Sequence, residues 1–358
     1  MLNSVSIDAI LSQFWEFLKT MVNIRRRHFL QLSVGAGLAV AAHACSQPQS
    51  KIAQGDGSES PGKIAVGFWP VASGLPLFVA VEKGYFQAAG LEVEAVKFAN
   101  PNQVAEALIA GRLQGTGNGV ASGALGLAEI TSPGLFKILT SNPSNVNYVL
   151  DQVIVGQNSD IKSIQDLNGK AFATGPGAQN LAIAEAILSA AGVADPKVQQ
   201  LEISQHVAAI ESGQIDAAYT LEPTGTVGVV KGITRVLENG VVSKYILGDA
   251  KAPWFGGSAA LSSKFVEQYP ETTAAYAEAY RRAVQDIRDN PTEVRQYLTG
   301  YTAIEGELVE KVPLVGYTMY DEFTPEDIAY FQKYFDFMTD KGIFSRPIDV
   351  AALMYKPA

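Results

Sequence analysis

Short apolar runs alternate with amphipathic segments from Lys63 onward. The apolar runs at 63–68, 91–96, 114–118 and 136–140 predict strands, and the segments at 75–83, 102–110 and 120–129 predict helices. Pro76 suits the first turn of the first helix, where a proline loses no hydrogen bond. The strands are apolar throughout rather than at alternate positions, which is typical of strands buried on both faces. The pattern therefore predicts a mostly parallel sheet flanked by helices.

A second series of the same kind begins after a turn at 142–145. Strands are predicted at 148–155, 170–173, 199–202 and 217–220, and helices at 163–167, 179–191 and 206–212. From Pro270 onward the chain reads as almost all helix, at 270–289, 291–299, 305–312 and 325–341. No repeat of fixed period is visible. The chain thus predicts two α/β units followed by a helical tail.

The segment before the strands has the composition of an export signal. Arg25, Arg26 and Arg27 precede an apolar run that ends in small residues before Cys45. The run is short for a membrane span, so we interpret it as a removed signal. Arg26 and Arg27, followed by Phe29 and Leu30, resemble a twin-arginine (Tat) signal, an address used in bacteria.

Cys45 follows Ala42-His43-Ala44 and resembles the cysteine of a lipoprotein cleavage box, which is acylated. The alternative is an ordinary cleavage near Ala44, with Cys45 incidental. Residues 46–62 are rich in Ser, Gln, Gly and Pro and predict a flexible tether. We therefore expect an N-terminal extension and signal over 1–44, with either Met1 or Met21 as the start, and a lipidated tether over 45–62.

The composition excludes several kinds of functional site from the residues after the signal and tether. The net charge is −9 with the basic signal included, which argues against nucleic acid as a partner. Of three histidines, only His206 lies beyond the signal, and we expect it at the surface or as a helix cap. A histidine-rich metal site and a Ser-His-Asp triad are therefore not predicted. One cysteine permits no disulfide within the chain.

Several segments resemble the substrate-binding proteins of bacterial ABC transporters of the nitrate/sulfonate/taurine type, a group that includes thiamine-precursor binders. The matching segments are Pro76–Ala80, Lys83–Phe86, Gly90–Val93, Ala107–Gly111 with Gln114-Gly115, Ser163–Lys170, and Gly213–Ala218 with Glu222-Pro223. Each motif is short, and their common order and spacing over about 63–350 carry the resemblance. Gln114 stands where the family usually has Asp.

The resemblance implies a two-lobed type II periplasmic-binding fold, in which the lobes close on a ligand by a hinge. Lobe one would comprise 63–143 plus 255–358, and lobe two 148–250. The chain would cross between the lobes near 142–148 and 252–257.

Ligands in open α/β sheets bind beyond the carboxyl ends of strands, and this rule selects the candidate binding residues. They are Trp69, Pro70 and Ser73 after the first strand; Asn118, Gly119 and Ser122 after the third; Thr174, Gly175, Gly177 and Gln179 before a helix; and Tyr219, Glu222 and Trp254. The loop at 174–179 resembles an anion-binding helix N-terminus or, alternatively, a plain turn. Trp69 and Trp254 suggest a stacking platform, although Trp69 could also belong to the core.

None of these loops contains an arginine or lysine, so an aromatic or heterocyclic ligand fits them about as well as a small anion. We predict a monomeric solute receptor, lipid-anchored on the periplasmic or extracytoplasmic face of a bacterial membrane. It would deliver a sulfonate, nitrate, taurine or pyrimidine-like solute to an ABC permease and its ATPase, without cofactor or metal. The alternatives are a cofactor-biosynthesis enzyme on the same fold, with Glu222 or Asp216 as acid or base, and a sensor-linked binding module.

Overall fold

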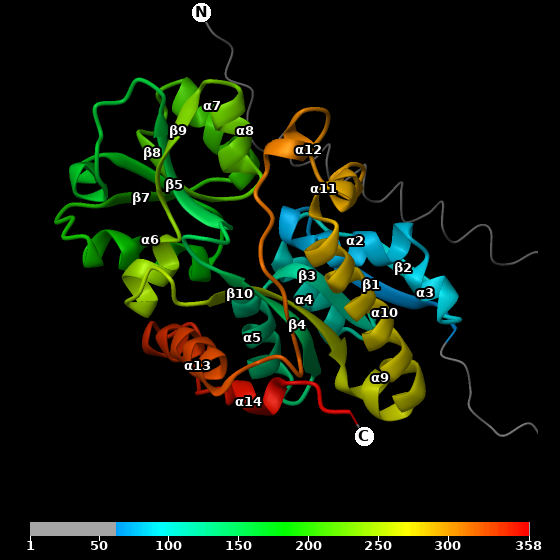
Figure 1. Ribbon diagram of the computed structural model, residues 1–358. Coiled ribbons are helices and arrows are strands. Elements are labelled where there is room, and N and C mark those ends of the chain that lie inside the picture. Colours follow the sequence, from blue (N-terminus) through cyan, green and yellow to red (C-terminus); the bar gives the residue numbers. More distant parts are fainter. Residues whose placement is uncertain (1–61, 358) are drawn as a thin grey trace, which may run out of the picture. The chain divides into compact units, whose positions relative to one another are not determined.

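The computed structural model describes residues 62–357 (Figure 1). The predicted signal residues Arg26 and Arg27 and the predicted acylation site Cys45 lie outside the described residues. None of the helices in the described part is both long and apolar enough to cross a membrane.

Eleven strands within residues 62–357 form two sheets. The first sheet has the order β11-β4-β10-β3-β1-β2 and the second the order β7-β6-β8-β5-β9. The strands are β1 Ile64–Phe68, β2 Val93–Lys97, β3 Gly115–Ala121, β4 Phe136–Ser144, β5 Asp151–Gly156, β6 Ala171–Thr174, β7 Lys197–Gln200, β8 Ala217–Leu221, β9 Thr234–Asn239, β10 Trp254–Ser262 and β11 Thr318–Met319. The first sheet takes its strands from both ends of the described chain, and the second from the middle.

The predicted fold class is confirmed, with one correction to the sheets. In the first sheet β1 pairs in parallel with β2 and β3, but β10 runs antiparallel to both β3 and β4. In the second sheet β6 is parallel to β7 and β8, whereas β5 is antiparallel to β8 and β9. Both sheets are therefore mixed rather than mostly parallel, because the strands adjoining the two crossings run against their neighbours.

Helices cover these sheets. They are α2 Leu75–Glu82, α3 Tyr85–Ala88, α4 Pro101–Ile109, α5 Ser122–Thr131, α6 Ala178–Ala190, α7 His206–Glu211, α8 Thr224–Val230, α9 Ser263–Gln268, α10 Pro270–Asp289, α11 Pro291–Val294, α12 Leu308–Lys311, α13 Pro325–Asp340 and α14 Val350–Leu353. The predicted helix at 291–299 ends as a 3-10 turn after α11, and the one at 305–312 shortens to α12. The sequence pattern does not predict strands β9, β10 and β11.

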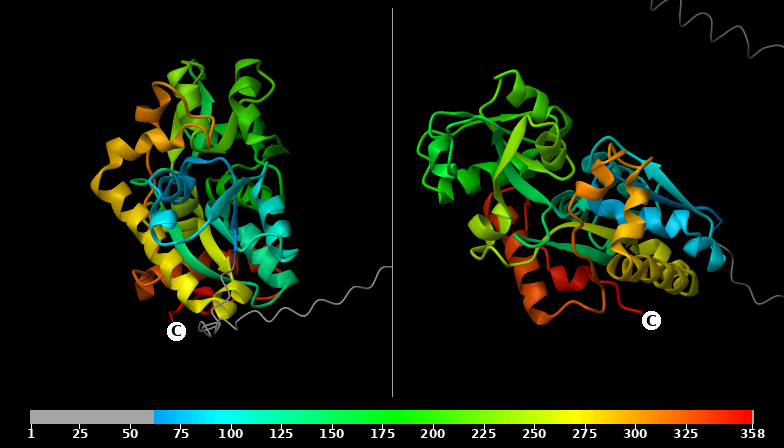
Figure 2. Two further views of the ribbon diagram at one scale, coloured as in Figure 1. Left: turned by 90° about the vertical axis from the view of Figure 1, so that its right-hand side faces the viewer. Right: turned by 45° about the horizontal axis from the view of Figure 1, so that its top comes forward.

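The long helix α10 fastens the helical tail to the first sheet. It packs against α2 and α3, and Figure 2 shows it running along one side of the molecule. Phe86 of α3 stacks on Tyr276 of α10 with ring centroids 4.8 Å apart. Lys83 and the Tyr85 hydroxyl both reach the Asp286 carboxylate, at 2.6 and 2.8 Å. Apolar burial, supplemented by this partly buried ion pair, holds the two segments together.

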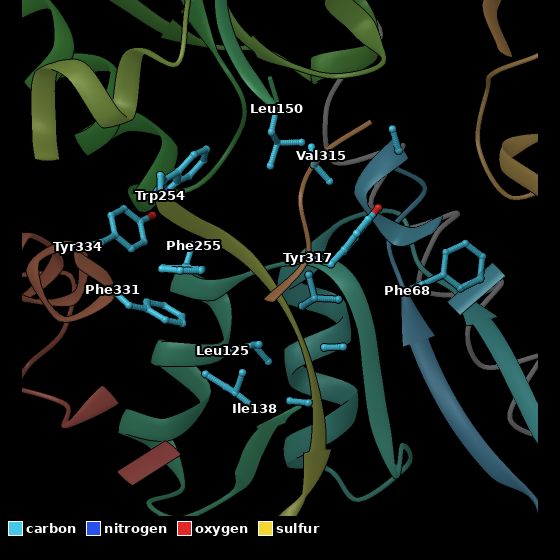
Figure 3. Close-up of a cluster of buried hydrophobic side chains, with 14 of the residues drawn as sticks. Phe68, Leu125, Ile138, Leu150, Trp254, Phe255, Val315, Tyr317, Phe331 and Tyr334 are labelled. Atoms are coloured by element: carbon cyan, nitrogen blue, oxygen red, sulfur yellow. The ribbon is translucent and has the colours of Figure 1, made fainter. Parts of the chain in front are cut away.

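Helix α13 packs at the start of β10, where the chain returns from the second sheet to the first. Phe255 lies on Phe331 with centroids 5.2 Å apart, and Trp254 meets Tyr334 edge to face at 5.9 Å. Figure 3 shows the two pairs side by side. All four side chains are buried, so this aromatic cluster is a structural core at the crossing.

The end of β3 is held by a tyrosine from α10. The Tyr280 hydroxyl donates to Asn118 Oδ1 at 2.8 Å and accepts from the Asn118 backbone N–H at 3.2 Å. Gly119 follows with a φ of 88°, a conformation that favours glycine, and Gly257 of β10 lies close against it. The Tyr280–Asn118 pair therefore fixes the strand end from which the turn into α5 starts.

We expect Tyr280→Phe to lower the free energy of unfolding by about 1–2 kcal/mol, because two buried groups of Asn118 lose their partner. The matched control is Tyr276→Phe on the same helix. Tyr276 is equally buried, and its hydroxyl makes no hydrogen bond among the described residues. Urea unfolding of both variants tests this, and equal losses for the two would contradict it.

Candidate functional site

A cavity of about 500 Å³ lies between loops of the two sheets. Its lining from the first sheet and the tail comes from the segments after β1, β2 and β3, from the start of β10 and from Thr302-Ala303. Its lining from the second sheet comes from the start of α6, the turn at 202–204 and the end of β8. The cavity is thus placed where strands of both sheets end, which is the usual position of a ligand site in α/β folds.

Most of the predicted ligand-binding residues line this cavity. They are Trp69, Pro70, Ser73, Gly119, Gly177, Gln179, Tyr219, Glu222 and Trp254. Asn118, Ser122, Thr174 and Gly175 are not among the lining residues. The strand-end rule therefore selects loops that line this cavity, but not always the residue in each loop that faces it.

The predicted residues that miss the cavity tie neighbouring elements together instead. The Asn118 side chain is used by Tyr280 and donates to Asn142 Oδ1 at 3.2 Å. Ser122 Oγ lies 3.1 Å from Ser258 Oγ, and Thr174 Oγ1 donates to the Asn180 carbonyl at 3.1 Å. These polar side chains satisfy buried groups next to the cavity wall.

Glu222 is the one buried carboxyl group in the lining, with 2 % of its surface exposed. Its Oε1 accepts from Gln152 Nε2 at 2.5 Å, and its Oε2 from the Thr226 backbone N–H at 3.2 Å. Burial raises the pKa of Glu222, while these donors counteract part of the rise. Gln152 can lie there because residue 225 is a glycine, where a Cβ atom would approach Gln152 Nε2 to 1.9 Å.

A second buried carboxyl group, Asp151, opens β5 directly opposite Leu221 of β8. Its Oδ2 accepts from the Val242 backbone N–H at 2.9 Å, and its Oδ1 has no hydrogen-bond partner in the described part of the chain. Burial raises the pKa of Asp151 to about 6. Burial and the charge of Asp151 together raise the pKa of Tyr219, whose hydroxyl is likewise unpartnered within 62–357.

The two predicted tryptophans differ in exposure. Trp69 is half-buried and lines the cavity, whereas Trp254 is only 2 % exposed and packs on Tyr334 (Figure 3). A symmetrical stacking platform is therefore not formed, and Trp69 presents the larger accessible face.

His206 is buried rather than on the surface, which corrects the prediction. Its Nε2 lies 3.0 Å from the Leu201 carbonyl, and burial lowers its pKa to about 4. It does not line the cavity. A neutral histidine that anchors a turn to α7 has a packing role.

Sequence reasoning missed several parts of the lining, among them Leu150 and the turn at 202–204. The end of β2 and the segment after it also line the cavity, through Lys97, Ala99, Asn100, Pro101 and Asn102, and the strand-end rule could have selected them. Thr302 and Ala303 come from a loop of the tail, for which no sequence signal exists. Lys97 is exposed and is the one cation among the lining residues.

At two helix starts beside the cavity, one backbone N–H group is already used by a side chain. The Asn100 side chain accepts from Gln103 N at the start of α4, and Gln200 Oε1 accepts from Gly177 N at 2.7 Å before α6. The predicted anion site at 174–179 is therefore partly filled by the protein itself. Helix α5 starts without a side-chain cap.

Side chains of the two sheets also meet beside the cavity. Gln179 of α6 lies over Gly123 of α5, where a Cβ atom would come within 1.8 Å of Gln179 Oε1. Helix α12 of the tail contacts α8 of the second sheet, as Figure 1 shows. Within residues 62–357 no group of three metal-ligating side chains is gathered.

Residues 72–294, more than half of the chain, match the family described as NMT1/THI5 like. This chain belongs to the NMT1/THI5-like family. A putative aliphatic sulfonates-binding protein of Bacillus subtilis (strain 168) is 25 % identical over 286 residues, covering 77 % of this chain and 81 % of the relative. The predicted family is thus confirmed.

Solved structures show the same fold for this NMT1/THI5-like chain. The periplasmic aliphatic sulphonate binding protein SsuA from Escherichia coli aligns with a TM-score of 0.68 at 17 % identity, over 84 % of this chain and 94 % of that one. The alkanesulfonate-binding protein SsuA from Xanthomonas axonopodis pv. citri, bound to MOPS, gives 0.66 at 17 %, over 83 % and 99 %. The predicted periplasmic-binding fold is thus confirmed.

We expect the contribution of Asp151 to the stability of this NMT1/THI5-like protein to fall as pH rises from about 4 to 6, opposite in direction to the contribution of His206, whose pKa is lowered to about 4. The pKa of Asp151 is higher in the folded protein than in the unfolded chain, so the folded state binds the proton more tightly, and that advantage is lost once pH exceeds the folded pKa. The loss is up to about 3 kcal/mol.

Asp151→Asn removes this contribution and retains an acceptor for Val242, so the unfolding free energy of the wild-type protein minus that of the variant falls over the same range. Urea titrations at several pH values measure the effect. Asp195→Asn, at an exposed site, serves as the control. An unchanged pH profile in Asp151→Asn would show that this carboxyl group does not titrate there.

Proposed function

We propose that this protein is the extracytoplasmic receptor of an ABC importer, which binds a small solute in the cavity and presents it to a permease and its ATPase. The observation that carries the proposal is the cavity itself, which is lined by strand ends of two separate sheets. Such a site is completed only when both halves contact the ligand, which suits capture by hinge closure. The names of the relatives as binding proteins support the same role.

The proposed lobes are 63–143 plus 255–358 and 148–250, joined by the two crossings. The first sheet and the tail fall in the former set and the second sheet in the latter, which supports these boundaries. The receptor acts as a monomer without cofactor. The solute belongs to the sulfonate, nitrate, taurine or pyrimidine-like classes.

An enzyme on the same fold is the alternative, because Glu222 is a buried acid with a raised pKa in the cavity. The other candidate acid, Asp216, accepts from the Ala171 backbone N–H at 2.8 Å and thus braces β6 against β8. Because Asp216 has this structural role, Glu222 would have to act as the acid or base without Asp216. We therefore favour the receptor.

Titration by intrinsic fluorescence and calorimetry tests the receptor with nitrate, ethanesulfonate, taurine, 4-aminopyridine and aromatic acids. Binding of one class with no change in the solute, followed by mass spectrometry, is the expected result. Failure to bind any member of the set would contradict the receptor, and conversion of a solute would favour the enzyme.

We expect Gly123→Ala to weaken binding of the tightest solute in that set by about tenfold, because the added methyl group displaces Gln179. Alanine has the higher helix propensity, so the unfolding free energy should not fall. In a Gln179→Ala background the same change should have no further effect. Calorimetry of the four proteins completes the cycle, and additive losses would exclude a role for this contact in closure.

We expect Cys45→Ala to abolish labelling by radioactive palmitate and to move the protein from the membrane to the soluble fraction, with solute affinity unchanged. A lipid anchor attached through a flexible tether would leave the binding domain unaffected. Replacement of Arg26 and Arg27 by Lys should separately block export by the Tat route. Palmitate label that persists in Cys45→Ala would remove the anchor from the proposal.

A further inference from the structure

The buried charges near the cavity are all of one sign. Glu222 lines it, and Asp151 lies on the adjacent strand, where it pairs with Leu221. No Lys or Arg is among the buried residues of 62–357, and the lining cation Lys97 is exposed. A buried carboxylate is costly unless a positive charge or several donors compensate it.

Only neutral groups contact the two carboxylates. Glu222 receives one amide N–H from Gln152 and one backbone N–H from Thr226, and Asp151 receives the Val242 N–H. A negative charge at Glu222 is thus solvated by dipoles but is not neutralised. The structure leaves room for a compensating positive charge in the cavity itself.

Two lining residues carry hydroxyl groups that have no hydrogen-bond partner within residues 62–357. The hydroxyl group of Tyr219, a lining residue that is 2 % exposed, has no hydrogen-bond partner in the described structure, and the same is true of Ser73 Oγ on the opposite side. Both hydroxyl groups belong to lining residues and can hydrogen-bond to a solute in the cavity. The negative charge of Asp151 also raises the pKa of the Tyr219 hydroxyl group.

The features that would hold an anion are weaker. The N–H group before α6 is used by Gln200, and α4 is capped by Asn100. The starts of α5 and α6 both lack a side-chain cap, and the start of α5 lies on the first sheet's side of the cavity. That site suits an acceptor atom at the far end of a solute whose near end meets Glu222.

We propose that the cavity selects a solute that carries a protonated, N–H-bearing nitrogen, which donates to the Glu222 carboxylate between the aromatic faces of Trp69 and Tyr219. The inference rests on the proposed receptor function and specifies its solute. A charge-assisted hydrogen bond in a buried site is strong, and aromatic faces attract cations further. The proposal departs from the plain alkanesulfonates in the names of the relatives.

A matched pair of probes tests the charge. 4-Aminopyridine and aniline have nearly the same shape, but at pH 7 the first is protonated on its ring nitrogen and the second is neutral. Calorimetry should show 4-aminopyridine binding at least about tenfold more tightly than aniline. Ethanesulfonate and nitrate serve as the anionic arm and should bind more weakly than 4-aminopyridine.

Glu222→Gln keeps the shape and removes the charge, so it should bring the ratio of the two affinities close to one. Glu211→Gln removes the same charge from an exposed position on α7 and should keep the wild-type ratio. Circular dichroism and thermal melting establish that both variants fold. A Glu222→Gln variant that fails to fold is replaced by Tyr219→Phe, which should lower the affinity for 4-aminopyridine severalfold.

Tighter binding of ethanesulfonate or nitrate than of 4-aminopyridine would overturn the inference and leave the receptor standing. So would a preference for 4-aminopyridine that survives in Glu222→Gln. Absence of binding by every solute in the set would instead contradict the receptor itself.

Discussion

The pairing of β10 with both β3 and β4 is the interaction on which the rest of the structure depends. Through it a strand from late in the chain enters the middle of a sheet that the N-terminal strands began. The first residues of β10 also carry Trp254, Gly256 and Gly257 to the cavity. Loss of this pairing would therefore detach the tail and remove one wall of the cavity at the same time.

The close approach of β10 and β3 depends on small residues. A Cβ atom on Gly257 would lie 3.1 Å from the Gly119 Cα atom, and one on Gly115 would lie 2.7 Å from the Ala260 carbonyl. The same absence of side chains concealed β10 in the sequence, because Trp254–Ser262 contains two glycines and two alanines and lacks the β-branched run of a typical strand. Packing between strands, rather than local preference, selects the extended conformation here.

Strand β1 and helix α2 could be predicted because nearly all of their apolar residues are buried. His206, in contrast, is buried by the turn at Leu201 that it anchors, which a pattern of single residues does not reveal. Asp151 lies within a predicted strand, but the apolar pattern of that strand does not predict that this carboxyl group is one of the most deeply buried charged groups. The loops that line the cavity could be predicted from the strand ends. Which residue of a loop faces the cavity could not, because side chains such as Asn118 and Thr174 hydrogen-bond to neighbouring elements instead.

Helix α12 has a consequence for the mechanics of binding. The segment from the 3-10 turn at 295–298 to β11 contains α12, which contacts α8 beside the second sheet before the chain returns to the first sheet. The two sheets are therefore connected by this contact as well as by the chain crossings. The contact restricts how one sheet can rotate against the other between an open and a closed arrangement. Restricting the free protein in this way lowers the entropy lost when a ligand is enclosed, so that a small solute with few contacts can still be retained.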